Sequence, residues 1–129
     1  LVRDREQVLA ALDAGREQIV DARSPGRFAG TDPEPRAGLR SGRIPGSRNL
    51  PAGRLVDPET GTFLPARELR ARFEEAGVDI SRPVVTSCGS GVTAATLAFA
   101  LHLLGSDRVA VYDGSWADWG RPGNTPVEK

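Results

Sequence analysis

Apolar residues follow two different periods that alternate along the chain. In some segments they recur at helical spacing, and between these segments lie the short continuous apolar runs that form buried strands. With a start signal at Ser24-Pro25, the pattern predicts helices over residues 1–14, 25–29, 65–76 and 91–104 and strands over residues 19–22, 47–50, 83–87 and 108–112. Strands that alternate with helices indicate an α/β domain with a mainly parallel sheet.

The two longest helical patterns in the second half differ in their apolar surface. The helix over residues 65–76 is amphipathic, with Leu69 and Phe73 directed inward and Gly77 as its end signal. The helix over residues 91–104 is apolar on nearly every side, which predicts that it lies in the interior.

The composition fits a single globular domain. A chain of 129 residues with 39% hydrophobic and 26% charged residues has the size and balance of one folded core. Its one cysteine cannot form an internal disulfide. No apolar run approaches the ~20 residues of a membrane span, and no signal-peptide pattern opens the chain. The sequence therefore predicts neither a disulfide scaffold nor a membrane partner.

A formal net charge of zero conceals a basic segment. Residues 23–54 hold seven arginines and two acidic residues, whereas residues 1–22 and 55–79 are net acidic. Nucleic acid is a poor explanation of this segment, since aromatic residues make up only 5% of the chain and no nucleic-acid-binding motif appears. Small anions remain open as partners, because arginine forks match carboxylate and sulfonate groups.

The loop after the strand over residues 83–87 is where chemistry is expected, because ligands bind beyond the carboxyl ends of parallel strands. This loop consists of Cys88, Gly89, Ser90, Gly91, Val92 and Thr93. Its two glycines allow positive φ angles and a close approach of the backbone to a ligand. Successive N–H groups and the following helix start can hold an anion, so the thiol is expected to be reactive and to have a lowered pKa. The alternative interpretation is a small buried cysteine that only packs at a strand end.

A dinucleotide site is the first competing hypothesis for this loop. Residues 89–94 fit the pattern G-x-G-x-x-G/A, and Asp113 ends the next predicted strand. However, only 16 residues follow Asp113, too few to complete a nucleotide-binding sheet, and the motif follows a late strand rather than the first.

Phosphatase, metal and dyad chemistry are also disfavoured. A cysteine phosphatase needs an arginine six positions after its cysteine, where this chain has Ala94. One cysteine and one histidine, His102, cannot supply a metal-ligand set. His102 also lies some nine helical residues beyond the loop, too far along a helix for a Cys–His dyad. We therefore expect a structural or surface role for His102, no metal and no cofactor.

Several motifs together resemble the rhodanese-type sulfurtransferases. They are Val20-Asp21-Ala22-Arg23-Ser24, Gly26-Arg27-Phe28-Ala29-Gly30, Pro33-Glu34-Pro35-Arg36, Gly42-Arg43-Ile44-Pro45-Gly46-Ser47, the Cys88 loop through Ala94, and Tyr112-Asp113-Gly114-Ser115-Trp116. The loop resembles the 3-mercaptopyruvate sulfurtransferase branch, whereas thiosulfate-preferring relatives usually carry basic residues just after the cysteine. Arg43 departs from the family, which more often has histidine at that position. The resemblance implies a rhodanese-like domain over residues 1–129, with a central, mainly parallel five-stranded sheet and helices on both faces.

The resemblance also implies an activity and roles for single residues. A sulfane sulfur passes from 3-mercaptopyruvate or thiosulfate to Cys88 as a persulfide and then to a thiol, thioredoxin or cyanide. Arg27 and Arg36 correspond to the arginines that bind the donor carboxylate and keto group, with a surface arginine or a structural ion pair as the alternative for each. Ser90 corresponds to a residue proposed to assist proton transfer. A thiosulfate-preferring enzyme and a non-catalytic binding or regulatory module remain the alternative functions.

The remaining expectations concern structure and context. Asp21 and Arg23 are expected to be structural, Asp113 to be a turn residue, and Trp116 and Trp119 to pack a C-terminal turn under the site. The resemblance is to the second domain of tandem-rhodanese proteins, so we expect this chain to be a C-terminal half that works with an N-terminal rhodanese domain. A cytoplasmic location is expected.

Overall fold

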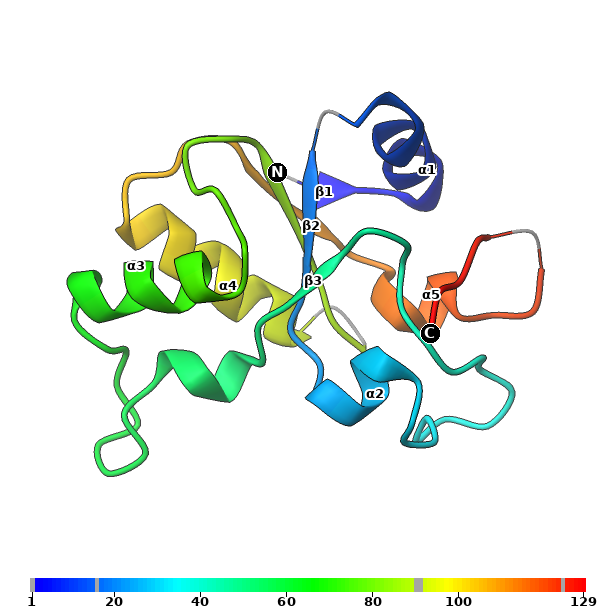
Figure 1. Cartoon of the computed structure of the whole chain (residues 1–129), viewed down its shortest axis with the longest axis horizontal. Helices are drawn as coiled ribbons and strands as arrows, with labels where there is room; N and C mark the ends of the chain where they lie inside the picture. The colour runs from blue at the N-terminus through cyan, green and yellow to red at the C-terminus, as the bar shows by residue number, and fades with distance from the viewer. Residues whose placement is uncertain (1, 16, 90–91, 124) are drawn as a thin grey trace.

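A five-stranded parallel sheet forms the centre of the computed structural model, which describes residues 2–15, 17–89, 92–123 and 125–129 (Figure 1). Its strands lie in the order β1-β5-β4-β2-β3, and all four neighbouring pairs are parallel. The strands are β1 (Val2–Arg3), β2 (Gln18–Asp21), β3 (Arg48–Asn49), β4 (Val84–Ser87) and β5 (Val109–Tyr112). The predicted α/β class and the five-stranded sheet are confirmed.

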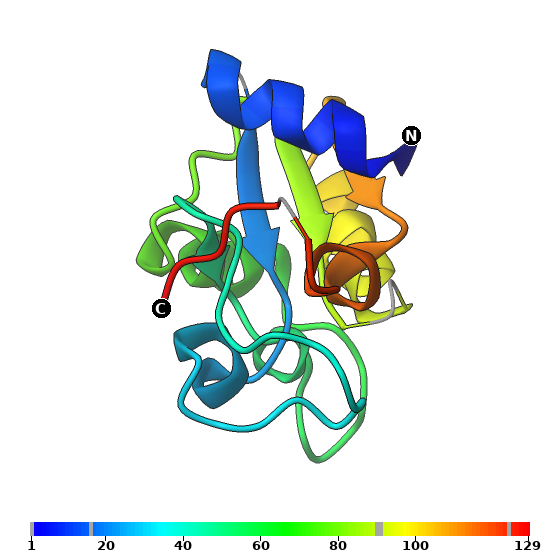
Figure 2. The ribbon, with the colours of Figure 1, turned by 90° about the vertical axis from the view of Figure 1, so that its right-hand side faces the viewer.

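Helices cover both faces of the sheet. They are α1 (Arg5–Ala14), α2 (Pro25–Ala29), the 3₁₀ helix η1 (Ala52–Leu55), α3 (Ala66–Glu75), α4 (Val92–Leu103) and α5 (Ser115–Trp119). In Figure 1, α3 and α4 lie on one side of the strands, and α1 and α5 lie on the other. Figure 2, turned by 90°, shows α1 crossing in front of the upper ends of β2 and β4, and α5 in front of α4.

The alternation of side chains along the strands divides the core into two clusters. In β2, Val20 joins the cluster under α3 and α4, whereas Ile19 faces the cluster under α1 and α5. Val84 and Val85 divide in the same way along β4. Because both faces are covered, the strands are continuous apolar runs, as is typical of parallel sheets.

Two predicted elements differ from the structure. The expected helix over residues 1–14 begins only after Asp4, because Asp4 and Gln7 form a capping box in which each side chain accepts the other's backbone N–H at 2.8 Å. Residues 2–3 are instead a strand paired with β5. The expected C-terminal turn around the tryptophans is the short helix α5.

The prediction that the helix over residues 91–104 is interior on every side is wrong. One face of α4 is fully buried, including Leu97 and Leu101, but Phe99 and Leu103 are 52% and 49% exposed. A helix packed on one face of a sheet keeps an outer side, even where its sequence is apolar. None of the helices in the described part of the chain combines the length and apolar character needed to span a membrane.

The topology brings three segments to one edge of the sheet. Asp21 at the end of β2 pairs in register with Ser87 at the end of β4, and Thr86 pairs with Val111 of β5. The segments that follow these three strands therefore lie beside one another, at the edge where α/β proteins bind ligands.

Candidate active site

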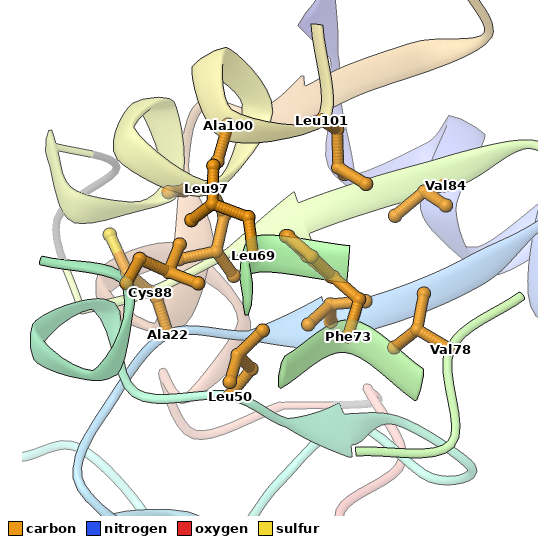
Figure 3. Packing of buried hydrophobic residues seen from close by; sticks show 13 residues of the cluster. Ala22, Leu50, Leu69, Phe73, Val78, Val84, Cys88, Leu97, Ala100 and Leu101 are labelled. Atoms are coloured by element: carbon orange, nitrogen blue, oxygen red, sulfur yellow. The ribbon is translucent and has the colours of Figure 1, made fainter. Parts of the chain in front are cut away.

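Cys88 follows β4 directly and lies at the border of the larger hydrophobic cluster. Its side chain is only 1% exposed. Figure 3 shows Cys88 near Ala22 and Leu97, with its sulfur directed away from Leu50 and Phe73. The hydroxyl of Thr86 donates to the carbonyl of Ala94 at 2.9 Å, which ties β4 to the first turns of α4. Cys88 is thus placed between a buried strand end and the start of a helix, as predicted.

The first turn of α5 fixes the backbone of Cys88 and Gly89. The N–H of Trp116 donates to the carbonyl of Cys88 at 2.9 Å, and the N–H of Ala117 donates to the carbonyl of Gly89 at 2.8 Å. Both peptide planes are therefore held by a helix that the sequence pattern did not reveal.

Ser115 contacts Cys88 and was missed as a site residue. Its Oγ accepts the N–H of Cys88 at 3.0 Å, donates to the carbonyl of Tyr112 at 2.8 Å and lies 3.9 Å from the Cys88 sulfur. Ser115 is completely buried and has a φ of +50°, which is unusual for a residue other than glycine. A serine held in this conformation indicates that the surrounding contacts fix it. The sequence signals were its place just after the Asp113-Gly114 turn and its membership of the Tyr112–Trp116 motif, to which no role for Ser115 was assigned.

Arg27 is brought to the Cys88 loop. An ideal Cβ built on Gly89 would lie 2.9 Å from Nη2 of Arg27, so the guanidinium fills the space that a side chain at residue 89 would need. Gly89 has no positive φ. At Gly89 the lack of a side chain therefore serves the close approach of Arg27 rather than a positive φ, whereas the expectation for Gly91 falls outside the described residues.

Glu34 holds Arg27 from the other side. Its Oε1 accepts from Nη2 of Arg27 at 2.9 Å and its Oε2 from Nη1 of Arg23 at 3.1 Å. The side chain of Glu34 is 1% exposed and that of Arg27 is 26% exposed. Sequence analysis assigned Glu34 no role.

Asp21 and Arg23, which were expected to be structural, form a buried ion pair with each other. Arg23 donates to Asp21 at 2.7 and 2.9 Å and to the carbonyl of Gly42 at 2.7 Å, and its guanidinium lies 4.4 Å from the ring centroid of Trp116. Both side chains are almost fully buried. Because a buried charge needs compensation by partners of this kind, the pair braces the loops around the site.

The other predicted residues are less closely joined to Cys88. Arg36 is exposed, and no hydrogen bond or ion pair of its side chain is found among the described residues. Thr93 is exposed in the first turn of α4, which begins at Val92. Ser90 and Gly91 lie outside the described residues. The roles given to these residues stay predictions.

The residues that were expected to have structural or surface roles are placed as follows. His102 is exposed on α4 and contacts the ring of Phe99 at a centroid distance of 6.4 Å. Asp113 is exposed in the turn after β5, and Trp116 and Trp119 are buried under the site. Within the described ranges, no group of three or more potential metal ligands is found.

Comparison with known proteins agrees with this geometry. The model of the rhodanese-like domain matches residues 4–122. The chain belongs to the rhodanese family. It is 45% identical over 99% of its length to thiosulfate/3-mercaptopyruvate sulfurtransferase 1, mitochondrial, of Arabidopsis thaliana, of which it covers 34%. It is 47% identical to the 3-mercaptopyruvate sulfurtransferase of Rattus norvegicus, over 92% of this chain and 39% of that protein. It is 48% identical to the thiosulfate sulfurtransferase of the same organism, over 94% of this chain and 41% of that protein.

Solved structures show the same similarity. The crystal structure of SseA from Escherichia coli, described as a 3-mercaptopyruvate sulfotransferase with the rhodanese fold, superposes with a TM-score of 0.75 at 41% identity, over 89% of this chain and 42% of that one. Tum1 from Saccharomyces cerevisiae gives a TM-score of 0.82 at 40% identity, over 92% and 42%. This rhodanese domain therefore spans about two fifths of the length of these relatives.

Proposed function

We propose that this rhodanese domain is a sulfurtransferase that carries a sulfane sulfur on Cys88. The observation that supports this most strongly is the placement of Cys88 between β4 and α4, with the guanidinium of Arg27 against the next residue, Gly89. A thiol in that position can become a nucleophile, and the positive end of the helix dipole favours the anion that forms there.

The reaction proceeds in two balanced steps. The Cys88 thiolate attacks the outer sulfur of the donor, and a sulfur–sulfur bond forms at Cys88. With 3-mercaptopyruvate the carbon–sulfur bond breaks and the electron pair leaves as the enolate of pyruvate, which takes a proton. With thiosulfate the sulfur–sulfur bond of the donor breaks and sulfite leaves with the electron pair. A thiol, thioredoxin or cyanide then accepts the outer sulfur and restores the Cys88 thiolate.

Arg27 is proposed to bind the anionic donor. Its guanidinium is partly exposed and already lies over the loop, and arginine pairs strongly with carboxylate groups. The exposed Arg36 is proposed to add a second contact when the donor is bound. Relatives named for each of the two donors match this chain at similar identity, so the proposal includes both donors. Of the two, 3-mercaptopyruvate is favoured, because Gly89 stands where thiosulfate-preferring relatives usually carry a basic residue.

The wider context is proposed on the same basis. Because the chain spans 34–41% of the length of the three curated relatives, we infer that it works beside a second rhodanese domain that completes the donor site. A cytoplasmic location stays a prediction, and the matched relative from Arabidopsis is named as mitochondrial.

Turnover with two donors tests the proposal. The protein is incubated with 3-mercaptopyruvate or thiosulfate and a small thiol acceptor, and pyruvate or sulfite is measured over time. Product is expected from the parent protein and none from Cys88→Ser. A parent protein that releases no product from either donor, with or without a second rhodanese domain added, would favour the binding-module function instead. Unchanged use of 3-mercaptopyruvate by Arg27→Ala and Arg36→Ala would refute the roles given to the two arginines.

A further inference from the structure

Glu34 occupies an unusual position for a charged residue in a loop. It lies between Pro33 and Pro35 in the irregular segment that follows α2, yet its side chain is 1% exposed. A carboxylate is buried to this extent only where charged partners compensate for the water it loses. Its Oε1 accepts from Arg27 at 2.9 Å, and its Oε2 accepts from Arg23 at 3.1 Å and from Arg27 at 3.4 Å.

The two arginines differ in what else binds them. Arg23 already has Asp21, the carbonyl of Gly42 and the ring of Trp116 as partners. Arg27 bonds to Glu34 through Nε and Nη2, at 3.4 and 2.9 Å. No other hydrogen bond of the Arg27 guanidinium is found in the described part of the chain. Glu34 is therefore the contact that sets where the Arg27 charge lies.

This contact leaves one side of Arg27 directed at the loop. Nη2 and Nη1 lie 2.9 and 3.7 Å from the ideal Cβ position of Gly89, the residue after Cys88. With Nε and one N–H of Nη2 directed at Glu34, the second N–H of Nη2 and the N–H groups of Nη1 are left to meet an anion. The parallel pair formed by one N–H of Nη2 and one N–H of Nη1 matches the two oxygens of a carboxylate.

We propose that Glu34 is a positioning residue that holds Arg27 over the Cys88 loop and so makes Cys88 select reagents that carry a carboxylate. This deepens the function proposed above, because it names the feature by which that site prefers a carboxylate-bearing donor. Glu34 acts through Arg27 and does not touch the donor itself.

The test compares how two alkylating reagents modify Cys88, the single cysteine. Iodoacetate carries a carboxylate, and iodoacetamide is its neutral analogue. The rate constant for iodoacetate divided by that for iodoacetamide therefore measures how strongly Cys88 selects a carboxylate, whether or not sulfur is transferred. The rates are followed by intact-protein mass spectrometry on the parent, Glu34→Gln, Arg27→Gln and the double variant. The ratio is expected to fall about tenfold in each single variant, since one charge-assisted hydrogen bond is lost, and no further in the double variant.

The chain offers a closely matched control. Glu17 accepts from Arg3 through Nε at 3.4 Å and Nη2 at 3.0 Å, nearly the geometry of the Glu34–Arg27 pair, but it precedes β2 at the opposite edge of the sheet. Glu17→Gln is expected to leave the ratio unchanged. Glu34→Asp keeps the charge beside Arg23 while drawing the carboxylate back from Arg27, so it provides a second, folded test if Glu34→Gln unfolds, and its ratio is also expected to fall.

The outcomes separate this proposal from the proposed function. The positioning role would be overturned if the ratio fell in Arg27→Gln but stayed at the parent value in the folded Glu34 variants. It would also be overturned if the Glu34 variants reacted more slowly with both reagents by the same factor. A ratio that changes as expected in a protein that releases neither pyruvate nor sulfite would instead refute sulfur transfer and leave the role of Glu34 intact. With sulfur transfer present, Glu34→Gln is expected to raise KM for 3-mercaptopyruvate more than KM for thiosulfate, at similar kcat.

Discussion

Replacing Gly89 by alanine tests the placement of Arg27 while leaving Arg27 and Cys88 themselves unchanged. The added Cβ would lie 2.9 Å from Nη2 of Arg27, closer than real Cβ atoms approach other atoms. Because Gly89 has no positive φ, alanine introduces no backbone strain there. The guanidinium is the far end of a flexible, 26% exposed side chain, so it is the group expected to move.

The expected effect on function is larger than the effect on stability. Arg27 gives up its place at the loop, and losing a charge-assisted hydrogen bond to the donor carboxylate costs about 1.5 kcal/mol, which corresponds to a KM for 3-mercaptopyruvate about tenfold higher. The value of kcat is expected to stay within about twofold. The lost contact binds the donor equally well in the ground state and in the transition state, so its loss raises KM and leaves the chemical step unchanged. The free energy of unfolding is expected to change by less than about 1 kcal/mol, since no core side chain is displaced.

Steady-state kinetics and urea unfolding provide the measurements, with Gly53→Ala as the matched control. Gly53 likewise has no positive φ, and nothing lies within 4 Å of its ideal Cβ, so both KM and stability should remain near the parent values. The Arg27→Ala,Gly89→Ala double variant should be no worse than Arg27→Ala alone. A KM unchanged by Gly89→Ala, or a double variant whose effects add, would refute the inferred position of Arg27 at the donor site.

Three other perturbations test the surroundings of the site. Ser115→Ala leaves the buried N–H of Cys88 without its acceptor and is expected to lower the free energy of unfolding by about 1–3 kcal/mol; a urea midpoint equal to that of the parent would contradict this. Arg23→Met removes the charge that compensates buried carboxylates and is expected to cost about 3–5 kcal/mol, measured in the same way, and a cost below about 1 kcal/mol would contradict it. Burial and the hydrogen bond to Asp118 raise the pKa of Tyr112 above its ordinary value of 10.0. The neutral phenol therefore contributes stability that is fully present below pH 10 and is lost as the pH rises further. Since Tyr112 is the single tyrosine, tyrosinate absorbance should be absent from the folded protein somewhat above pH 10 and appear on unfolding, and a titration near pH 10 in the folded state would count against the buried bond.

The sequence was most informative where local pattern and tertiary structure agree. Strands β2 and β4 are largely buried on both faces, and β5 is buried on one face and partly buried on the other, so their apolar runs were visible. The end of β4 locates Cys88. Strand β1 has only two residues and depends on pairing with β5 near the other end of the chain, which no local pattern reveals.

The supporting contacts of the site could not be predicted for a related reason. Glu34 lies between two prolines, in a segment typical of an exposed loop, and is buried only because Arg23 and Arg27 converge on it. Ser115 belongs to a helix of five residues whose backbone conformation is set by contacts with Cys88 and Tyr112. Such roles arise from tertiary contacts between segments far apart in the sequence.

The most direct test of the central claim is the mass of the protein after exposure to a sulfur donor. The parent is incubated with 3-mercaptopyruvate without an acceptor and analysed intact, and the modified peptide is then mapped. We expect a gain of one sulfur atom at Cys88, its loss when a thiol is added, and no gain in Cys88→Ser. A parent protein that gains no sulfur from either 3-mercaptopyruvate or thiosulfate, or a Cys88→Ser protein that gains as much, would contradict the claim that Cys88 carries the sulfur.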